Sequence, residues 1–145
     1  MELDCFTLRR KLLIVGSGAI GVEAFSRGAR KVTFVENTSQ GIKLIKENTI
    51  KVDCELDIVN HNVKSFLSST NQTFDYIFMD PPYDIERSEI DELVKVIKDR
   101  DLLVENGELI IELNEKKQLE FEGMNTFKFK KYGVSSFSFI KDNNE

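Results

Sequence analysis

The stretch Asp80-Pro81-Pro82-Tyr83 combines residue types that could hold and orient a flat polar group. It follows residues 76–79, a short apolar run rich in strand-forming side chains, which is typical of a central strand covered on both faces. Pro81 and Pro82 fix two successive φ angles and remove two backbone donors, so the strand must end there. A carboxylate, free carbonyl groups and an aromatic ring at that point could bind a ring that carries N–H donors. The simpler alternative is an edge turn in which Asp80 and the prolines only terminate the strand.

A glycine-rich segment predicts a second part of the same site. Gly16, Gly18 and Gly21 fit the pattern G-x-G-x-x-G directly after the apolar run 11–15. Glycines let the backbone pass close to a ligand, and the helix expected to follow offers N–H groups and the positive end of its dipole. Glu36 ends the next β-branched run, where its carboxylate could accept hydrogen bonds from ribose hydroxyls. These features fit both NAD and S-adenosylmethionine, since each ligand contains an adenosine.

Residues elsewhere favour S-adenosylmethionine over NAD. The Asp-Pro-Pro-Tyr end of the fourth predicted strand has no role in hydride transfer. Asn62 follows the third predicted strand, and its amide could bond an adenine edge, cap the next helix, or do both. Asn37 follows Glu36 and is a further N-cap candidate.

The elements expected around these residues alternate between strands and helices. Expected strands cover residues 11–15, 31–36, 55–59, 76–79 and 108–113, and an antiparallel hairpin of half-exposed segments covers 126–130 and 135–140. Helices are expected after Gly18 as far as Gly28, up to about Asn48, from about Val63, and around Ile90 to Ile97. Residues 84–88 are expected to form a loop over the site, and residues 105–107 a turn.

This alternation predicts a parallel sheet with right-handed crossovers in an α/β fold. The closing hairpin indicates a Rossmann-like, seven-stranded sheet of order 3-2-1-4-5-7-6 with helices on both faces, the arrangement of S-adenosylmethionine-dependent methyltransferases. At 145 residues the whole chain, 1–145, is expected to be one domain.

Composition excludes several classes of protein. Charged residues make up 31% and hydrophobic residues 41%, which is typical of a globular domain. No apolar run is long enough to span a bilayer or to form a signal peptide, so we expect a cytoplasmic protein without a membrane partner. Cys5 and Cys54 are expected to be reduced thiols, and no metal site is expected because His61 stands alone.

Charge is distributed unevenly along the chain. The net charge is −5, and residues 52–127 carry seven Lys or Arg against eighteen Asp or Glu. Residues 128–145 carry four Lys or Arg against two Asp or Glu. The overall balance argues mildly against tight nucleic-acid binding, and clusters such as 128–131 could be phosphate-binding patches or ordinary solvated surface.

Four segments of the chain resemble the RsmD family, which are bacterial methyltransferases that modify the N2 amine of a guanine in 16S ribosomal RNA. The matching segments, in the family's order and spacing, are residues 16–29, 32–36, 58–67 and 74–83. The resemblance extends from about residue 12 to the end of the chain. It implies S-adenosylmethionine as cofactor and, as partner, 16S rRNA or a small-subunit assembly intermediate. We expect the chain to act as a monomer.

The resemblance also implies roles for individual residues. Gly16, Ser17 and Gly18 would surround the methionine end of S-adenosylmethionine. The ribose would lie at Glu36 with Asn37, and the adenine at Asn62 and Val63. Asp80 would border the cofactor and, with Pro81 and Pro82, form the catalytic turn in which Asp80 and the Pro81 carbonyl accept hydrogen bonds from the target amine. Tyr83 would stack on a flipped base.

Two departures from the family pattern accompany the resemblance. Family members usually begin with a basic hairpin and a helix of some forty residues, whereas this sequence starts almost at the first predicted strand. The family's first motif also carries an Asp near the cofactor's ammonium group, and the matching position here is Leu12, with Asp4 as a displaced candidate.

The sequence leaves three alternatives to an active rRNA methyltransferase. An adenine-N6 DNA methyltransferase shares the Asp-Pro-Pro-Tyr motif but usually carries a target-recognition domain. An NAD-binding oxidoreductase is favoured only by G-x-G-x-x-G and Glu36. A catalytically reduced methyltransferase-fold protein that binds RNA or a protein partner is favoured by Leu12 and by the short N-terminal region.

Overall fold

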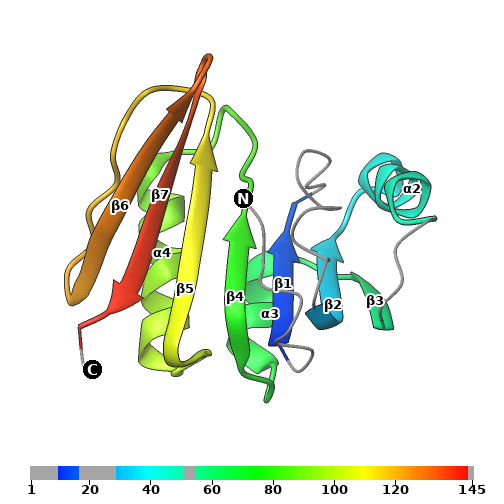
Figure 1. Cartoon of the computed structure of the whole chain (residues 1–145). Helices are drawn as coiled ribbons and strands as arrows, with labels where there is room; N and C mark the ends of the chain where they lie inside the picture. Colours follow the sequence, from blue (N-terminus) through cyan, green and yellow to red (C-terminus); the bar gives the residue numbers. More distant parts are fainter. Residues whose placement is uncertain (1–9, 17–28, 51–54, 144–145) are drawn as a thin grey trace.

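The computed structural model of the protein describes residues 10–16, 29–50 and 55–143 (Figure 1). The strands are β1 (Arg10–Val15), β2 (Ala29–Glu36), β3 (Glu55–Asn60), β4 (Phe74–Met79), β5 (Leu103–Leu113), β6 (Met124–Tyr132) and β7 (Ser135–Asp142). The helices are α2 (Ser39–Asn48), α3 (Val63–Ser69) and α4 (Arg87–Asp99). The helix predicted after Gly18 lies outside the described residues.

All seven strands form one sheet, of order β3-β2-β1-β4-β5-β7-β6. Strands β1 to β5 pair in parallel, whereas β7 pairs antiparallel with both β5 and β6. The order confirms the Rossmann-like, seven-stranded arrangement predicted from the sequence. The reversal of strand order between β1 and β4 is the point where open α/β sheets bind ligands.

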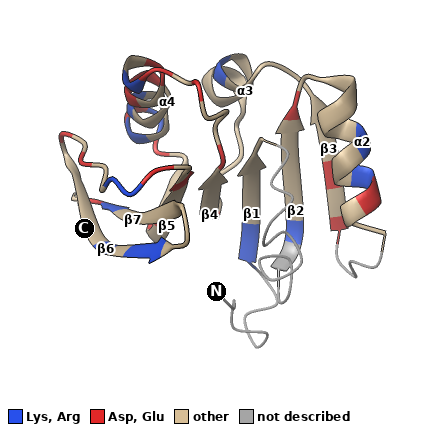
Figure 2. Cartoon of the chain, turned by 90° about the horizontal axis from the view of Figure 1, so that it is seen from above, with Lys and Arg blue, Asp and Glu red and all other residues tan. Residues whose placement is uncertain are grey.

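Helices cover the two faces of the sheet with separate cores. Figure 2 shows α3 and α4 on the same side of the sheet, and their residues Leu67, Val94 and Ile97 pack against that face of the strands. Ile45 of α2 packs on the other face, against Val32 and Phe34. Because both faces are covered, β4 is apolar almost throughout, as a central parallel strand requires.

Local hydrogen bonds fix where the helices begin. The Thr38 hydroxyl accepts from the Gly41 N–H at 3.0 Å, and Asn62 Oδ1 accepts from the Ser65 N–H at 3.1 Å. Each bond satisfies a backbone donor that a helix start leaves unpaired. Helix α4 starts at Arg87, so the loop predicted over residues 84–88 ends earlier than expected.

Helices α3 and α4 are joined at their ends by one side chain. The Arg100 guanidinium donates from the same nitrogen to the Leu67 carbonyl at 2.7 Å and the Thr70 carbonyl at 2.8 Å. Charged donors to backbone carbonyls are among the stronger hydrogen bonds in proteins. The end of α3 is therefore tied to the residue that follows α4.

Two predictions about the second half of the chain need correction. The turn predicted at residues 105–107 is an irregularity inside β5. Leu103 pairs with Phe74 and Glu108 pairs with Tyr76, so β5 advances by more residues than β4 between these two pairs. The prediction that both hairpin strands are half-exposed is wrong for β7. That strand lies between β5 and β6, and Ser136, Ser138, Phe139 and Ile140 are all buried.

Candidate functional site

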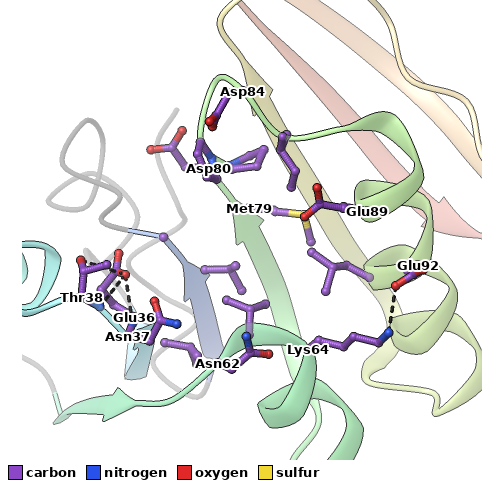
Figure 3. Close-up of a pocket in the computed structure, with 18 residues that line it drawn as sticks. Glu36, Asn37, Thr38, Asn62, Lys64, Met79, Asp80, Asp84, Glu89 and Glu92 are labelled. Atoms are coloured by element: carbon purple, nitrogen blue, oxygen red, sulfur yellow. Dashed lines mark hydrogen bonds and ion pairs between the residues drawn. The ribbon is translucent and has the colours of Figure 1, made fainter.

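The carboxyl ends of β1, β2, β3 and β4 converge around one cavity. The Asp80 N–H donates to the Val15 carbonyl at 3.0 Å and the Gly16 N–H donates to the Val35 carbonyl at 3.3 Å, which links three of the strand ends. The cavity has a volume of about 750 Å³. Its lining, drawn in Figure 3, includes Gly16, Glu36, Asn37, Thr38, Asn62, Val63, Lys64, Asp80, Pro81, Pro82, Asp84, Glu89 and Glu92. The structure thus brings most of the predicted site residues together.

Gly16 forms the floor of the cavity beside Asp80. Its φ of +101° lies in the region that favours glycine. A Cβ atom at this position would overlap the backbone oxygen of Asp80. Glycine is therefore required here for both reasons. Ser17 and Gly18, which were assigned to the same loop, lie outside the described residues.

The Glu36 carboxylate is held in place by the turn that follows it. Its Oε1 accepts from the Asn37 N–H at 2.9 Å, the Thr38 N–H at 3.2 Å and the Thr38 hydroxyl at 3.3 Å (Figure 3). A Cβ on Gly41 would lie 2.6 Å from Glu36 Cγ and Oε2, so only glycine leaves room for this side-chain position. These bonds to Oε1 orient the carboxylate at the end of β2.

Asn62 and Lys64 form another wall of the cavity. Asn62 both caps α3 and lines the cavity, so the two interpretations of this residue are compatible. Val63 beside it supplies an apolar surface. Lys64 Nζ contacts Glu92 Oε2 at 2.9 Å and so bridges α3 and α4 across the cavity (Figure 3).

Asp80 and the prolines form the turn expected from the sequence, with one difference. The carbonyl of Pro82 accepts the Ile85 N–H at 3.0 Å, so it is not free to bind a ligand as predicted. No described residue donates a hydrogen bond to the Pro81 carbonyl. Burial raises the pKa of Asp80 above its usual value, because the ionised form loses hydration.

Tyr83 lies at the edge of the turn. It is 86% exposed, and it lines a second cavity of about 300 Å³ together with Pro81, Pro82 and Leu113. The two cavities share the prolines. An exposed ring beside the Asp80 turn is free to stack on a planar ligand.

Glu112 is a site residue that the sequence analysis missed. Its neighbour Ile111 pairs with Met79, which places Glu112 beside Asp80 at the carboxyl end of the adjacent strand. Glu112 is 9% exposed, and burial together with the charge of Asp80 raises its pKa to about 7. An acidic residue at the end of the apolar run 109–111 was the available signal.

The cavity lining is strongly acidic. Among the described residues, five carboxylates line it against one ammonium group, that of Lys64, and the carboxylates belong to Glu36, Asp80, Asp84, Glu89 and Glu92. Such a lining favours a ligand that carries positive charge. Within the described ranges, no three His, Cys, Asp or Glu residues are grouped as a metal site would require, and no helix has the length and apolar character to cross a membrane.

Leu12 does not lie at the cavity. It is 1% exposed and packs with Ile14, Val32 and Phe34 in the core on the α2 side of the sheet. The position that matches the family's acidic residue is therefore a core position in this chain. Asp4, the displaced candidate, lies outside the described residues.

Several solved structures with the same fold are described as methylases or methyltransferases. The crystal structure of a Haemophilus influenzae protein described as a methylase superposes with a TM-score of 0.74 at 28% identity, over 94% of this chain and 89% of that one. The N-methyltransferase NodS from Bradyrhizobium japonicum, in complex with S-adenosyl-L-homocysteine, gives a TM-score of 0.72 at 12% identity, over 93% and 79% of the two chains. The fold is that of the Rossmann-like methyltransferases.

The sequence comparison identifies the family. The model of the family described as Conserved hypothetical protein 95 matches residues 9–141, and the chain belongs to this family. The ribosomal RNA small subunit methyltransferase D of Haemophilus influenzae is 30% identical over 128 residues, which cover 84% of this chain and 65% of that protein. The Escherichia coli K12 protein of the same name is 31% identical over 111 residues, covering 76% and 51%. The chain thus spans about half to two thirds of the length of these relatives.

Proposed function

We propose that the protein is an S-adenosylmethionine-dependent methyltransferase that acts on an exocyclic amine of a nucleobase, and that its target is the N2 of a guanine in 16S rRNA. The observation that carries the proposal is the Asp80-Pro81 turn, since both residues line the acidic cavity and no described residue donates a hydrogen bond to the Pro81 carbonyl. The family relationship and the names of the relatives support the choice of rRNA as substrate.

The cavity residues fit S-adenosylmethionine. Gly16 lets the backbone come close to a ligand, and Glu36 presents an oriented carboxylate to ribose hydroxyls. Asn62 and Val63 offer a polar and an apolar contact to an adenine. The acidic lining suits a cofactor that carries a sulfonium and an ammonium group, and the cofactor supplies the methyl group to be transferred.

Asp80 and the Pro81 carbonyl would act on the target amine. Its lone pair is delocalised into the base, and hydrogen bonds from its two N–H groups to these oxygens would favour a more localised, nucleophilic nitrogen. Alignment of nitrogen and methyl group then supplies much of the rate enhancement. A paired base cannot reach the turn, so it must be flipped or already unpaired, and Tyr83 would stack on it.

A catalytically reduced protein that binds RNA or a protein partner is the second candidate. The observation that favours it is Leu12, a core residue where the family carries an acidic residue near the cofactor. Under this alternative the protein keeps the fold and the Asp80 turn but does not catalyse methyl transfer. An NAD-binding oxidoreductase would use Gly16 and Glu36 but would leave the Asp80 turn without a role.

Calorimetric titration of the purified protein with S-adenosylmethionine, with NAD as control, tests the cofactor. Micromolar binding of S-adenosylmethionine alone supports the proposal and leads to assays of methyl transfer to small-subunit rRNA. Absence of binding to the folded protein would support the catalytically reduced alternative, and binding of NAD alone would support an oxidoreductase. We further propose a cytoplasmic monomer, which light scattering after size exclusion would test.

A further inference from the structure

One face of the β6–β7 hairpin carries aromatic and lysine side chains together. Residues directly opposite each other in antiparallel strands point to the same face, and Lys128 pairs with Phe139, Lys130 with Phe137, and Tyr132 with Ser135. Phe139 and Phe137 belong to the core on the α2 side of the sheet, which identifies the face. We call this the aromatic-lysine surface, formed by Phe127, Lys128, Lys130, Tyr132, Phe137, Phe139 and Lys141.

The side chains of the surface contact one another. The rings of Phe127 and Phe139 lie 6.3 Å apart, and the Tyr132 and Phe137 rings meet edge to face at 5.9 Å. Lys128 Nζ lies 5.0 Å from the centre of the Phe139 ring, and Lys141 Nζ lies 5.0 Å from that of Phe127. Lys128 therefore lies over the buried Phe139 ring, while Lys141 lies over the exposed Phe127 ring.

The hairpin separates its charges between its two faces. Asp142, the only acidic residue in strands β6 and β7, contacts Lys98 of α4 at 3.1 Å on the opposite face. That opposite face is also where Met124 packs with Leu119 in the core under α4. The aromatic-lysine surface consequently has lysines and no acidic residue, in a chain whose net charge is −5. Figure 2 shows basic residues on β6, and α4 as the described helix beside this part of the sheet, on the face opposite to the aromatic-lysine surface.

Two of the aromatic rings on this surface are exposed to solvent. Tyr132 is 62% exposed and Phe127 is 41% exposed. Isolated apolar side chains on a surface are common, but here they stand next to lysines on a face that lies beside the candidate site.

The surface is continuous with the Asp80 turn across the sheet. Glu112 lies beside Asp80, pairs with Phe137 on β7, and Phe137 pairs with Lys130 on β6. Glu112, Phe137 and Lys130 form a row across β5, β7 and β6, and Asp80 follows the end of the adjacent strand β4. With strands about 4.8 Å apart, Lys130 lies roughly 15 Å from Asp80. A chain molecule bound at Asp80 can thus reach the lysines directly.

We propose that the aromatic-lysine surface binds the single-stranded RNA segment next to the base that enters the Asp80 turn. Exposed rings on a sheet can stack on unpaired bases, and lysines between them can bind the phosphates, which is a common mode of single-strand recognition. An acidic peptide would use the lysines but would leave the rings without partners. The link to Asp80 rests on the proposed function, whereas RNA binding by the surface does not.

Fluorescence anisotropy of a labelled single-stranded RNA oligonucleotide tests the proposal, with the full chain and a series of salt concentrations. We expect Lys128→Glu/Lys130→Glu to weaken binding at least tenfold and to reduce the slope of log K against log salt by about 1.4. We expect Tyr132→Ala to weaken binding about fivefold or more while the slope is unchanged. Lys43→Glu/Lys46→Glu on α2 makes the same charge change away from the surface and should leave binding within twofold of wild type.

Three results would overturn the proposal. The first is equal loss of affinity in both double variants, and the second is unchanged affinity in Lys128→Glu/Lys130→Glu. The third is tighter binding of polyglutamate or of anionic vesicles than of RNA. Titration of the same variants with S-adenosylmethionine separates this inference from the proposed function. If the protein binds RNA but not the cofactor, the proposed function is contradicted and the proposal for the aromatic-lysine surface is not. If it binds the cofactor but not RNA, only the proposal for the aromatic-lysine surface is contradicted.

Discussion

Glu112 and Asp80 lie close together at the carboxyl ends of neighbouring parallel strands, and the charge of Asp80 acts on the Glu112 carboxyl group. Both carboxyl groups have raised pKa values, Asp80 through burial and Glu112 through burial and then the charge of Asp80. The negative charge of Asp80 disfavours the ionised form of Glu112. With a pKa of about 7, a substantial fraction of Glu112 is protonated at neutral pH.

The raised pKa of Glu112 beside Asp80 predicts that the free energy of unfolding falls as pH rises. Glu112 titrates at about 7 in the native protein, compared with its ordinary value of 4.5. The native state therefore holds more protons between these values, and its free energy of unfolding decreases as pH rises through that window. We expect Glu112→Gln to remove much of this decrease, which amounts to roughly 1–3 kcal/mol. Urea denaturation of both proteins at pH 4.5, 6 and 8 measures this decrease in the free energy of unfolding.

The exposed Glu105 on the same strand provides the control for this experiment. Glu105→Gln should keep the pH dependence of the wild type. If Glu112→Gln also keeps it, Glu112 does not titrate near neutrality and the coupling with Asp80 is absent.

Replacing Asp80 should separate chemistry from cofactor binding. We expect Asp80→Ala to reduce methyl transfer at least a hundredfold, because the target amine loses a hydrogen-bond acceptor that orients it. Affinity for S-adenosylmethionine should change little, as the ribose and adenine contacts lie elsewhere in the cavity. Single-turnover transfer and calorimetry on one preparation measure both quantities, and an equal loss of both would contradict the assigned role.

Replacing Gly41 with alanine should affect the stability of α2 and the affinity for the cofactor in opposite directions. Alanine is the better helix former by about 1 kcal/mol, so Gly41→Ala should not destabilise α2. Its Cβ would displace the Glu36 carboxylate, however, and we expect weaker cofactor binding by about tenfold. Gln40→Ala, at the exposed neighbouring position, should leave the affinity unchanged. Thermal unfolding and calorimetry together check the prediction, which fails if Gly41→Ala binds the cofactor normally.

Tyr83 should matter for RNA and not for the cofactor. Stacking on a base contributes roughly 1–3 kcal/mol, so we expect Tyr83→Ala to raise the KM for RNA between fivefold and a hundredfold. Tyr83→Phe keeps the ring and should behave like the wild type. Steady-state kinetics with both variants distinguishes stacking from a role of the hydroxyl group, which a defect in Tyr83→Phe would indicate.

The sheet could be predicted from the sequence because its signals are local. Runs such as 76–79 and the helix pattern around Ile90 and Val94 depend only on spacing. The irregularity in β5 and the burial of β7 could not be predicted, because they depend on which strand pairs with which. The sequence shows Asn106 and Gly107, which are typical of a turn. It does not show that Leu103 pairs with Phe74, which keeps these residues inside β5.

The candidate site likewise contains residues that could be predicted from the sequence and residues that could not. Gly16, Glu36 and Asp80 end predicted strands, so their convergence follows from the parallel sheet. Glu112 was missed because its significance comes from the register of β5 against β4, which no pattern within 108–113 reveals. The hydrogen bond from the Ile85 N–H to the Pro82 carbonyl is likewise a tertiary detail, and it occupies one of the acceptors that the sequence predicted to be free.

The bond between Arg100 and the carbonyls of Leu67 and Thr70 has a consequence for slow motions. It joins the ends of α3 and α4, which also carry Lys64 and Glu92 on the cavity wall. Amide hydrogens in the two helices should therefore exchange with solvent as one cooperative unit, while those of α2 exchange independently. One wall of the cavity would then open as a single body, and a ligand that contacts only α3 would slow exchange in α4 as well.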